Sequence, residues 1–196
     1  MKQQELVLEN QDKPYTVNPA KFLTWLFIVS IVMMFGALTS AYIVRRAEGN
    51  WLDFPLPNEL WLSSLFIVVS SFTLHWGYVA AKKNNFQHLK LALLSTLVLG
   101  VIFLFSQFKA WQDLVEMNVF FAGSKSNPSG SFLYVLTGLH GFHIVSGLVF
   151  LLVTIYKAFT LKIHSKNLTA IQTCSTYWHF LGGLWIYLFV FLLFYR

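Results

Sequence analysis

Four histidines stand in stretches of the chain that are otherwise apolar: His75, His140, His143 and His179. An imidazole in such a place can ligate a haem or a metal ion, or it can hydrogen-bond to a neighbouring helix. His140 and His143 lie in the run LTGLHGFHIVSGLVF, whose other residues suit a lipid-facing helix. The choice between these kinds of chemistry depends on the elements that hold the histidines.

Those elements are membrane spans. The chain has 196 residues, of which 56% are hydrophobic and only 11% charged, a balance that a soluble domain does not carry. Continuous apolar runs of about the ~20 residues that cross a bilayer as a helix occur at 22–44, 61–81, 90–110, 132–156 and 172–195. They lack the alternation of β-barrel strands. The sequence predicts an all-α membrane protein, a bundle of five transmembrane helices over residues 22–196, with a cytoplasmic N-terminal arm at 1–21.

Basic residues predict the orientation. Cytoplasmic loops of membrane proteins carry an excess of lysine and arginine. With the N-terminus inside, the inner segments hold Lys2, Lys13, Lys21, Lys82, Lys83, Lys90, Lys157, Lys162 and Lys166. The outer segments hold fewer, namely Arg45, Arg46, Lys109, Lys125 and Arg196. We therefore expect the N-terminus inside and the C-terminus outside. This rule and anionic lipid explain the basic inner face, so nucleic acid is not an expected partner.

The predicted spans contain no carboxylate. All 8 Asp and Glu residues fall in the N-terminal arm or in the two outer loops. Proton-coupled and cation-coupled carriers usually keep an ionisable acid within the membrane. No pair of short, Gly/Pro-broken helices is repeated between the two halves either, as inverted-repeat carriers would show. A self-sufficient transporter is disfavoured.

Polar and small residues follow one face of each span. On a helix, residues three or four apart share a face, and membrane helices pack through small and polar side chains. The second span places His75 on such a face, and the third places Gln107 there. In the fourth and fifth spans these faces include Thr137, His140, His143, Gly147, Gln172 and His179. The pattern favours helix packing as their role.

Haem or metal ligation remains the competing interpretation. His75 and His179 lie level enough to share one haem, as in b-type membrane anchors. His140 and His143 stand on one helix, so they cannot take opposite sides of a haem, and no other span offers a histidine at their depth. A zinc or copper ion there would lack a third ligand. We expect His140 and His143 to tie the fourth helix to its neighbours by hydrogen bonds.

Two segments together carry a family resemblance. LTGLHGFHIVSGLVF, followed further along by YWHFLGGLWIYLFVFLL, resembles subunit III of haem-copper terminal oxidases, the cytochrome c and quinol oxidase family. The first span, WLFIVSIVMMFGALTSAYIVRR, and the pair Gln107 and Trp111 extend the likeness over about 22–196. The chain is similar to the five-helix bacterial form.

The resemblance implies an accessory subunit without catalytic, metal-binding or cofactor-binding residues. Such a subunit packs beside catalytic subunit I, meets subunit II and small subunits, binds phospholipid and lies in the bacterial inner membrane, while haem and copper belong to subunits I and II. Membership of a respiratory supercomplex stays open. The candidates for helix packing or a lipid cleft are His75, Gln107, Trp111, Thr137, His140, His143, Gly147, Gln172, Trp178, His179 and Trp185.

The chain also departs from the family pattern. Ile31, Gln172 and Gly182 stand where the family usually has acids within the membrane, so the family's support of proton uptake is in question here. The alternatives are a b-haem membrane anchor of a quinone-linked enzyme, an uncoupled channel or carrier, and a subunit III-like protein of a quinol oxidase or a nitric oxide reductase. The sequence leaves the electron donor and the haem type of the complex open.

Overall fold

The fold is known from a computed structural model, which describes residues 18–124, 126–161, 163 and 167–195. Most of the described chain is helical, and each helix is long and apolar enough to cross a membrane. The predicted all-α bundle of five membrane-spanning helices is therefore confirmed. The helices are α2 (Pro19–Ala47), α3 (Glu59–Lys82), α4 (Phe86–Glu116), α5 (Pro128–Phe159) and α6 (Thr169–Tyr195).

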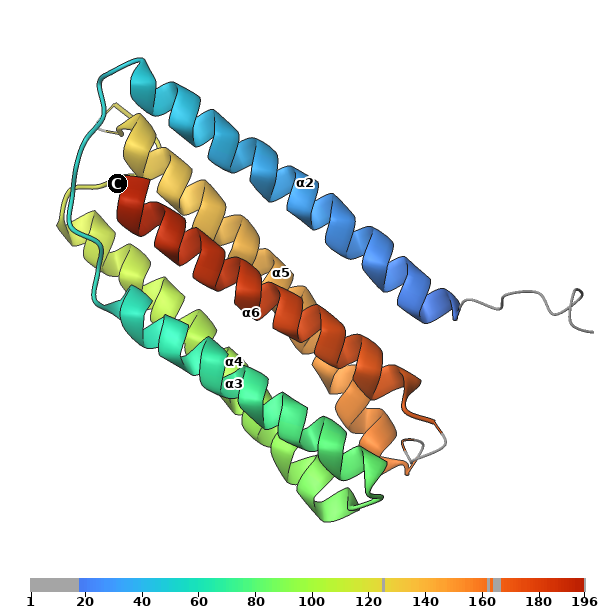
Figure 1. The fold of residues 1–196 in the computed structure, drawn as a ribbon. Coiled ribbons are helices and arrows are strands. Elements are labelled where there is room, and N and C mark those ends of the chain that lie inside the picture. The colour runs from blue at the N-terminus through green and yellow to red at the C-terminus, as the bar shows by residue number, and fades with distance from the viewer. Residues whose placement is uncertain (1–17, 125, 162, 164–166, 196) are drawn as a thin grey trace, which may run out of the picture.

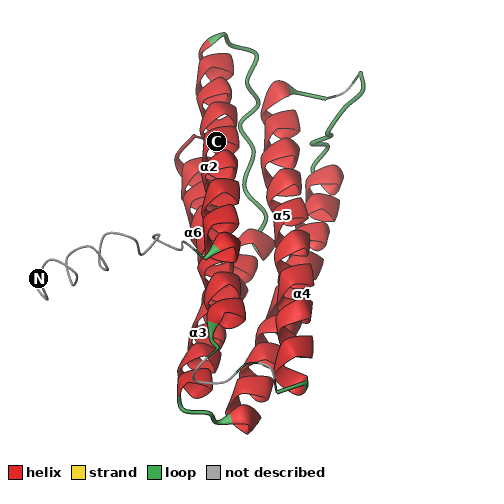
Figure 2. Cartoon of the chain, turned by 90° about the vertical axis from the view of Figure 1, so that its right-hand side faces the viewer, coloured by secondary structure: helices red, strands yellow, loops and turns green. Residues whose placement is uncertain are grey.

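The helices run up and down, and α6 lies in the middle of the bundle (Figure 1). α6 packs against α2, α3 and α5, while α3 and α4 form the most closely associated pair. Within the described chain α2 packs only on α5 and α6 and makes no contact with α3, its neighbour in sequence. The connection between α2 and α3 is a long loop that runs along the bundle (Figure 2). α2 and α3 therefore flank α6 on separate sides.

Asparagines mark several helix ends. Asn18 and Asn127 each precede a proline, and their side-chain oxygens accept from the backbone N–H groups of Ala20 and Ser129, at 3.1 Å in both cases. Asparagine caps and proline in the first turn favour a helix start, because they satisfy or remove N–H groups that lack partners. After α3, Asn84 adopts a left-handed φ of 53°, a conformation that ends helices.

The helices extend beyond the predicted spans. α4 has 31 residues, which at about 1.5 Å per residue gives about 46 Å, well over the ~30 Å of a hydrocarbon core. Hydropathy marks only the apolar middle, whereas backbone hydrogen bonds continue through the polar end turns. The prediction of 90–110 was therefore too short as a helix, and Asp113 and Glu116 lie on the last turns of α4. Likewise α2 begins at Pro19, inside the predicted arm; residues 1–17 lie outside the described chain.

Charge is segregated between the two ends of the bundle. The end where α2 and α6 begin, which we call the lysine end, carries Lys21, Lys82, Lys83, Lys90 and Lys157. The opposite end carries Arg45, Arg46 and Lys109 together with every acid of the described chain: Glu48, Asp53, Glu59, Asp113 and Glu116. Lys2, Lys13, Lys125, Lys162, Lys166 and Arg196 lie outside the described residues. The side of the membrane that each end faces stays a prediction.

Candidate functional site

His140 lies at the centre of an aromatic cluster. Its side chain is 0% exposed, and its ring centroid lies 6.4 Å from that of Phe35 on α2, 6.0 Å from Phe103 on α4 and 5.2 Å from Trp185 on α6. Neither ring nitrogen has a hydrogen-bond partner in the described chain. The expected interhelical hydrogen bond is therefore wrong for His140, because its neighbours at this depth present aromatic rings. It joins helices through ring packing.

His143 bonds within its own helix. Its Nδ1 lies 2.7 Å from the carbonyl oxygen of Leu139, one turn back on α5. The expected interhelical bond from this side chain is therefore also wrong. The polar contact between α5 and α6 at this level joins the hydroxyls of Ser146 and Tyr177, 2.7 Å apart. Sequence reasoning missed this pair, although Tyr177 belongs to the YWHF run and Ser146 lies a turn beyond His143.

Two tryptophans on α6 donate to serines on α3. Nε1 of Trp178 lies 3.0 Å from Oγ of Ser70, and Nε1 of Trp185 lies 2.9 Å from Oγ of Ser64. Both indoles are almost completely buried, at 1% and 0% exposure. A buried indole N–H needs an acceptor, and each serine supplies one. Trp178 and Trp185, expected to serve helix packing, therefore connect α6 to α3.

Glycines on α4 and α5 leave room for the Trp178 ring. A Cβ added at Gly100 would lie 2.7 Å from Cη2 of Trp178 and 2.8 Å from Cδ2 of Leu148. A Cβ at Gly147 would lie 3.4 Å from the same indole and 3.0 Å from Leu181. The distances at Gly100 are too short for carbon atoms without displacement, and those at Gly147 are tight against Leu181 and in contact with the indole. Trp178 therefore contacts α4 and α5 in the space that the two glycines provide.

Gln107, Trp111 and Thr137 form further interhelical bonds. Nε2 of Gln107 donates to Oγ of Ser63 over 2.8 Å, which joins α4 to α3. Nε1 of Trp111 donates to Oγ1 of Thr137 over 3.0 Å, which joins α4 to α5. Both bonds occur near the end of the bundle opposite the lysines. The predicted polar faces of the third and fourth spans do meet neighbouring helices.

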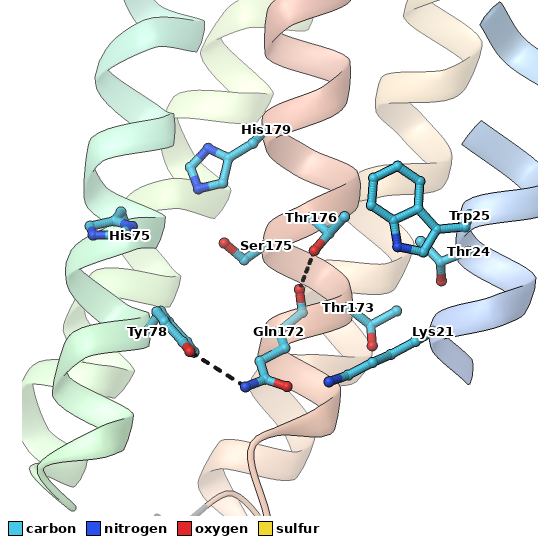
Figure 3. Close-up of a pocket in the computed structure, with 10 residues that line it drawn as sticks. All are labelled: Lys21, Thr24, Trp25, His75, Tyr78, Gln172, Thr173, Ser175, Thr176 and His179. Carbon is cyan, nitrogen blue, oxygen red and sulfur yellow. Dashed lines mark hydrogen bonds between the residues drawn. The ribbon is translucent and has the colours of Figure 1, made fainter. Parts of the chain in front are cut away.

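The remaining candidates line a cavity at the lysine end, which we call the lysine-end cleft. Its volume is about 420 Å³, and α2, α3 and α6 all contribute to it (Figure 3). His75 and His179 face each other across α3 and α6 with their ring centroids 6.3 Å apart, so the prediction that they lie level is confirmed. Nε2 of Gln172 donates to the Tyr78 hydroxyl over 3.4 Å. The full lining is Lys21, Thr24, Trp25, His75, Tyr78, Gln172, Thr173, Ser175, Thr176 and His179.

The sequence candidates thus separate into an interior group and a cleft group. The interior group consists of Gln107, Trp111, Thr137, His140, His143, Gly147, Trp178 and Trp185, and the cleft group of His75, Gln172 and His179. Across the part of the chain that the structure describes, no three His, Cys, Asp or Glu side chains come together as a metal site would require. Sequence reasoning missed Lys21, Trp25 and Tyr78, because nothing local indicates that α2 and α3 contribute residues to one cavity.

The positions that depart from the family pattern lie in different surroundings. Ile31 is 2% exposed and belongs to the apolar core. A Cβ at the buried Gly182 would lie 3.1 Å from Oγ of Ser71 on α3, so a side chain there would require Ser71 to shift. Gln172 lines the cleft. Only this last position could hold an acid without repacking buried side chains.

Comparison with known proteins agrees with this arrangement. A family model described as cytochrome c oxidase subunit III matches residues 11–196. The probable cytochrome c oxidase subunit 3 of Nocardia farcinica is 33% identical over 180 residues, covering 88% of this chain and 86% of the relative. The cytochrome c oxidase subunit 3 of Thermostichus vulcanus is 29% identical over 85% of this chain and 82% of its own. The cytochrome bo(3) ubiquinol oxidase subunit 3 of Buchnera aphidicola is 27% identical over 89% and 93%. A match over most of the chain, on a five-helix bundle whose HGFH and YWHF segments bury His140, His143, Tyr177 and Trp178, shows that the chain belongs to the cytochrome c oxidase subunit III family of haem-copper oxidases.

Proposed function

We propose that this chain packs beside catalytic subunit I of its oxidase, with subunit II and small subunits nearby, stabilises that subunit and binds phospholipid. It carries no redox centre of its own, and haem and copper are held by subunits I and II. The complex lies in a bacterial cytoplasmic membrane with the lysine end inside. Family membership supports association with other oxidase subunits.

The buried polar side chains of the bundle join helices to one another, which supports an accessory role. The buried donors Gln107, Trp178 and Trp185 bond to α3, so these side chains are engaged in holding helices together. A catalytic site in a membrane protein would instead direct ionisable groups toward a substrate path. The carboxylates of the described helices stand at Glu59, Asp113 and Glu116, on end turns next to the loops.

The outward faces of the helices support docking and lipid contact. In the most apolar window of α2 only 22% of residues are buried within the chain. Met33 on α2 and Phe105 on α4 are 71% and 72% exposed. Such continuous apolar surface must be covered by acyl chains or by another membrane subunit. Among the described helices α2 has the least buried window, and it packs there on α5 and α6 alone.

Deleting the chain tests this role. We expect an oxidase that lacks it to keep its initial electron-transfer rate but to lose activity sooner during turnover, measured as oxygen consumption over time. Adding the purified chain back restores the lifetime. An affinity tag on the chain should also co-purify subunit I. Loss of the initial rate in a fully assembled complex, or a tag that recovers no oxidase subunit, would contradict the proposal.

The absence of a redox centre has its own measurement. We expect the purified chain, free of subunit I, to show no haem Soret band, because the His75 and His179 rings are explained as walls of the cleft. A b-type difference spectrum at one haem per chain, lost in His75→Ala or His179→Ala, would favour the haem-anchor alternative.

A further inference from the structure

The lysine-end cleft differs in chemistry from the rest of the membrane-facing surface. Most outward positions along α2 and α3 are apolar, yet this cavity is lined by an ammonium, two imidazoles, an amide and several hydroxyls. Its volume of about 420 Å³ falls in the usual range of small-ligand sites. Polar groups gathered in one cavity at the end of a membrane bundle require a physical explanation beyond helix packing, because several of them do not bond across helices.

The charges of the cleft have one sign. Lys21 contributes its ammonium from the start of α2, and Figure 3 shows it directed toward Gln172 on α6. Lys82 lies a turn beyond Tyr78, with its Nζ 4.6 Å from the centre of that ring. No carboxylate lines the cleft, and the acids of the described helices and loops lie at the opposite end. An anion is therefore the ligand that these charges favour.

The hydrogen-bonding groups suit a phosphate. His75 and His179 face each other from α3 and α6, and a neutral imidazole offers one N–H donor. Ser175 adds a hydroxyl to the lining, so donors approach the cavity from more than one helix. A phosphodiester has acceptor oxygens only and no positive charge of its own. The ammonium of Lys21, with hydrogen-bond donors beside it, therefore suits a phosphodiester. The same ammonium would repel a metal cation.

The position of the cleft selects a lipid over a soluble anion. It lies where α2 and α3 flank α6 without contact between them, so the face of α6 is open toward the middle of the bilayer. One turn beyond His179, a Cβ added at Gly183 would meet nothing within 4 Å. Trp25, 59% exposed at the edge of the cleft, is typical of membrane interfaces. An acyl chain can therefore lie along this exposed part of α6 while the headgroup stays at the lysine end.

We propose that the lysine-end cleft binds the phosphodiester headgroup of an anionic phospholipid from the leaflet at that end of the bundle, in preference to a zwitterionic one, with Lys21, His75, His179 and Gln172 as the recognising groups. This inference rests on the phospholipid role proposed above and specifies its lipid class and its place. A zwitterionic headgroup would bring a cationic choline or ethanolamine next to Lys21, so the same site would bind it less well.

The test is competition between two lipids. The full chain, in its complex, is delipidated and exposed to equal amounts of phosphatidylglycerol and phosphatidylcholine, and the retained lipids are quantified by mass spectrometry. We expect phosphatidylglycerol to be enriched. Lys21→Gln should lower the enrichment about tenfold, because it removes the charge that repels the choline of phosphatidylcholine. His179→Gln should lower it less, because an amide still donates.

Lys83→Gln is the matched control. Lys83 is an exposed lysine at the same end that does not line the cleft, so its loss changes the general charge and leaves the site intact. Equal retention of the two lipids by the unmodified chain, or equal effects of Lys21→Gln and Lys83→Gln, would overturn the proposal. Displacement of phosphatidylglycerol by millimolar inorganic phosphate would show a soluble-anion site instead. Recovery of subunit I, measured in the same preparation, reports separately on the subunit role.

Discussion

At the scale of single residues, the contribution of a buried polar side chain to stability depends on what it contacts. Trp178 and Trp185 donate to serines, whereas His140 is surrounded by rings and has no partner in the described chain. All three are in the core, and all three were expected to pack helices together. A hydrogen bond between membrane helices contributes about 0.6 kcal/mol on average and up to about 1.7. We expect the tryptophan–serine bonds to be the ones whose loss can be measured.

Ser70→Ala tests this point. The substitution removes the acceptor of the Trp178 indole and hardly changes the packing, so the buried N–H is left without a partner. We expect the free energy of unfolding in a bilayer mimetic to fall by about 0.6 to 1.7 kcal/mol. The matched control is Ser95→Ala, because Ser95 bonds only to the carbonyl of Leu91 on its own helix. Equal changes in the two variants would show that the interhelical bond does not contribute.

At the scale of helices, small residues set how closely the elements approach. Trp178 of α6 lies against Gly100 of α4 and Gly147 of α5, so one side chain defines the separation of three helices. The charged end turns contribute differently. Lys109 and Glu59 form an ion pair of 3.6 Å between α4 and α3, in which the side chain of Lys109 is 66% exposed. Exposed pairs contribute little. Close packing at the glycines is therefore the stronger determinant of the arrangement.

Gly100→Ala is the corresponding experiment. The added methyl would lie 2.7 Å from the Trp178 ring, so α4 and α6 must move apart or the indole must leave its position. We expect overpacking to lower the free energy of unfolding by about 1–3 kcal/mol, and the tryptophan fluorescence to shift. Gly141→Ala on α5 is the control, since its Cβ meets nothing within 4 Å. A Gly100→Ala variant as stable as Gly141→Ala would mean that the helices are not in this contact.

At the scale of the whole molecule, the two ends of the bundle differ in charge. The described lysines of the lysine end have no acid near them, whereas the opposite end mixes both signs. Insertion depends on lysine and arginine in short loops near span ends. We therefore expect the lysine end to lie in the cytoplasm.

Reporter fusions measure that orientation. We expect a reporter joined after Lys83, in the turn between α3 and α4, to be cytoplasmic, and one joined near Ser126, before α5, to be exported. Alkaline phosphatase and a fluorescent protein give opposite signals at each point. The reversed pattern at both positions would overturn the orientation, and the proposed lipid site would then face the outer leaflet.

The sequence by itself determined the number and order of the membrane helices, the separation of charge and the family. These depend on composition and on residues close together in the chain, such as a continuous apolar run or the HGFH and YWHF segments. Helical periodicity also placed Thr137, His140 and Gly147 on one inward face. It could not state which neighbour each face meets, because that depends on how the helices rotate and pack.

Only the tertiary structure decided which residues contact one another across the helices. His140 faces rings from α2, α4 and α6 and not a hydrogen-bonding group, and Ser146 meets Tyr177. Lys21, far from His75 in sequence, lines the same cavity. Each of these contacts joins helices distant in the chain, and their relative positions follow from the volumes of all buried side chains together. That is why the histidines could be located in the membrane from the sequence, while their chemistry depended on the fold.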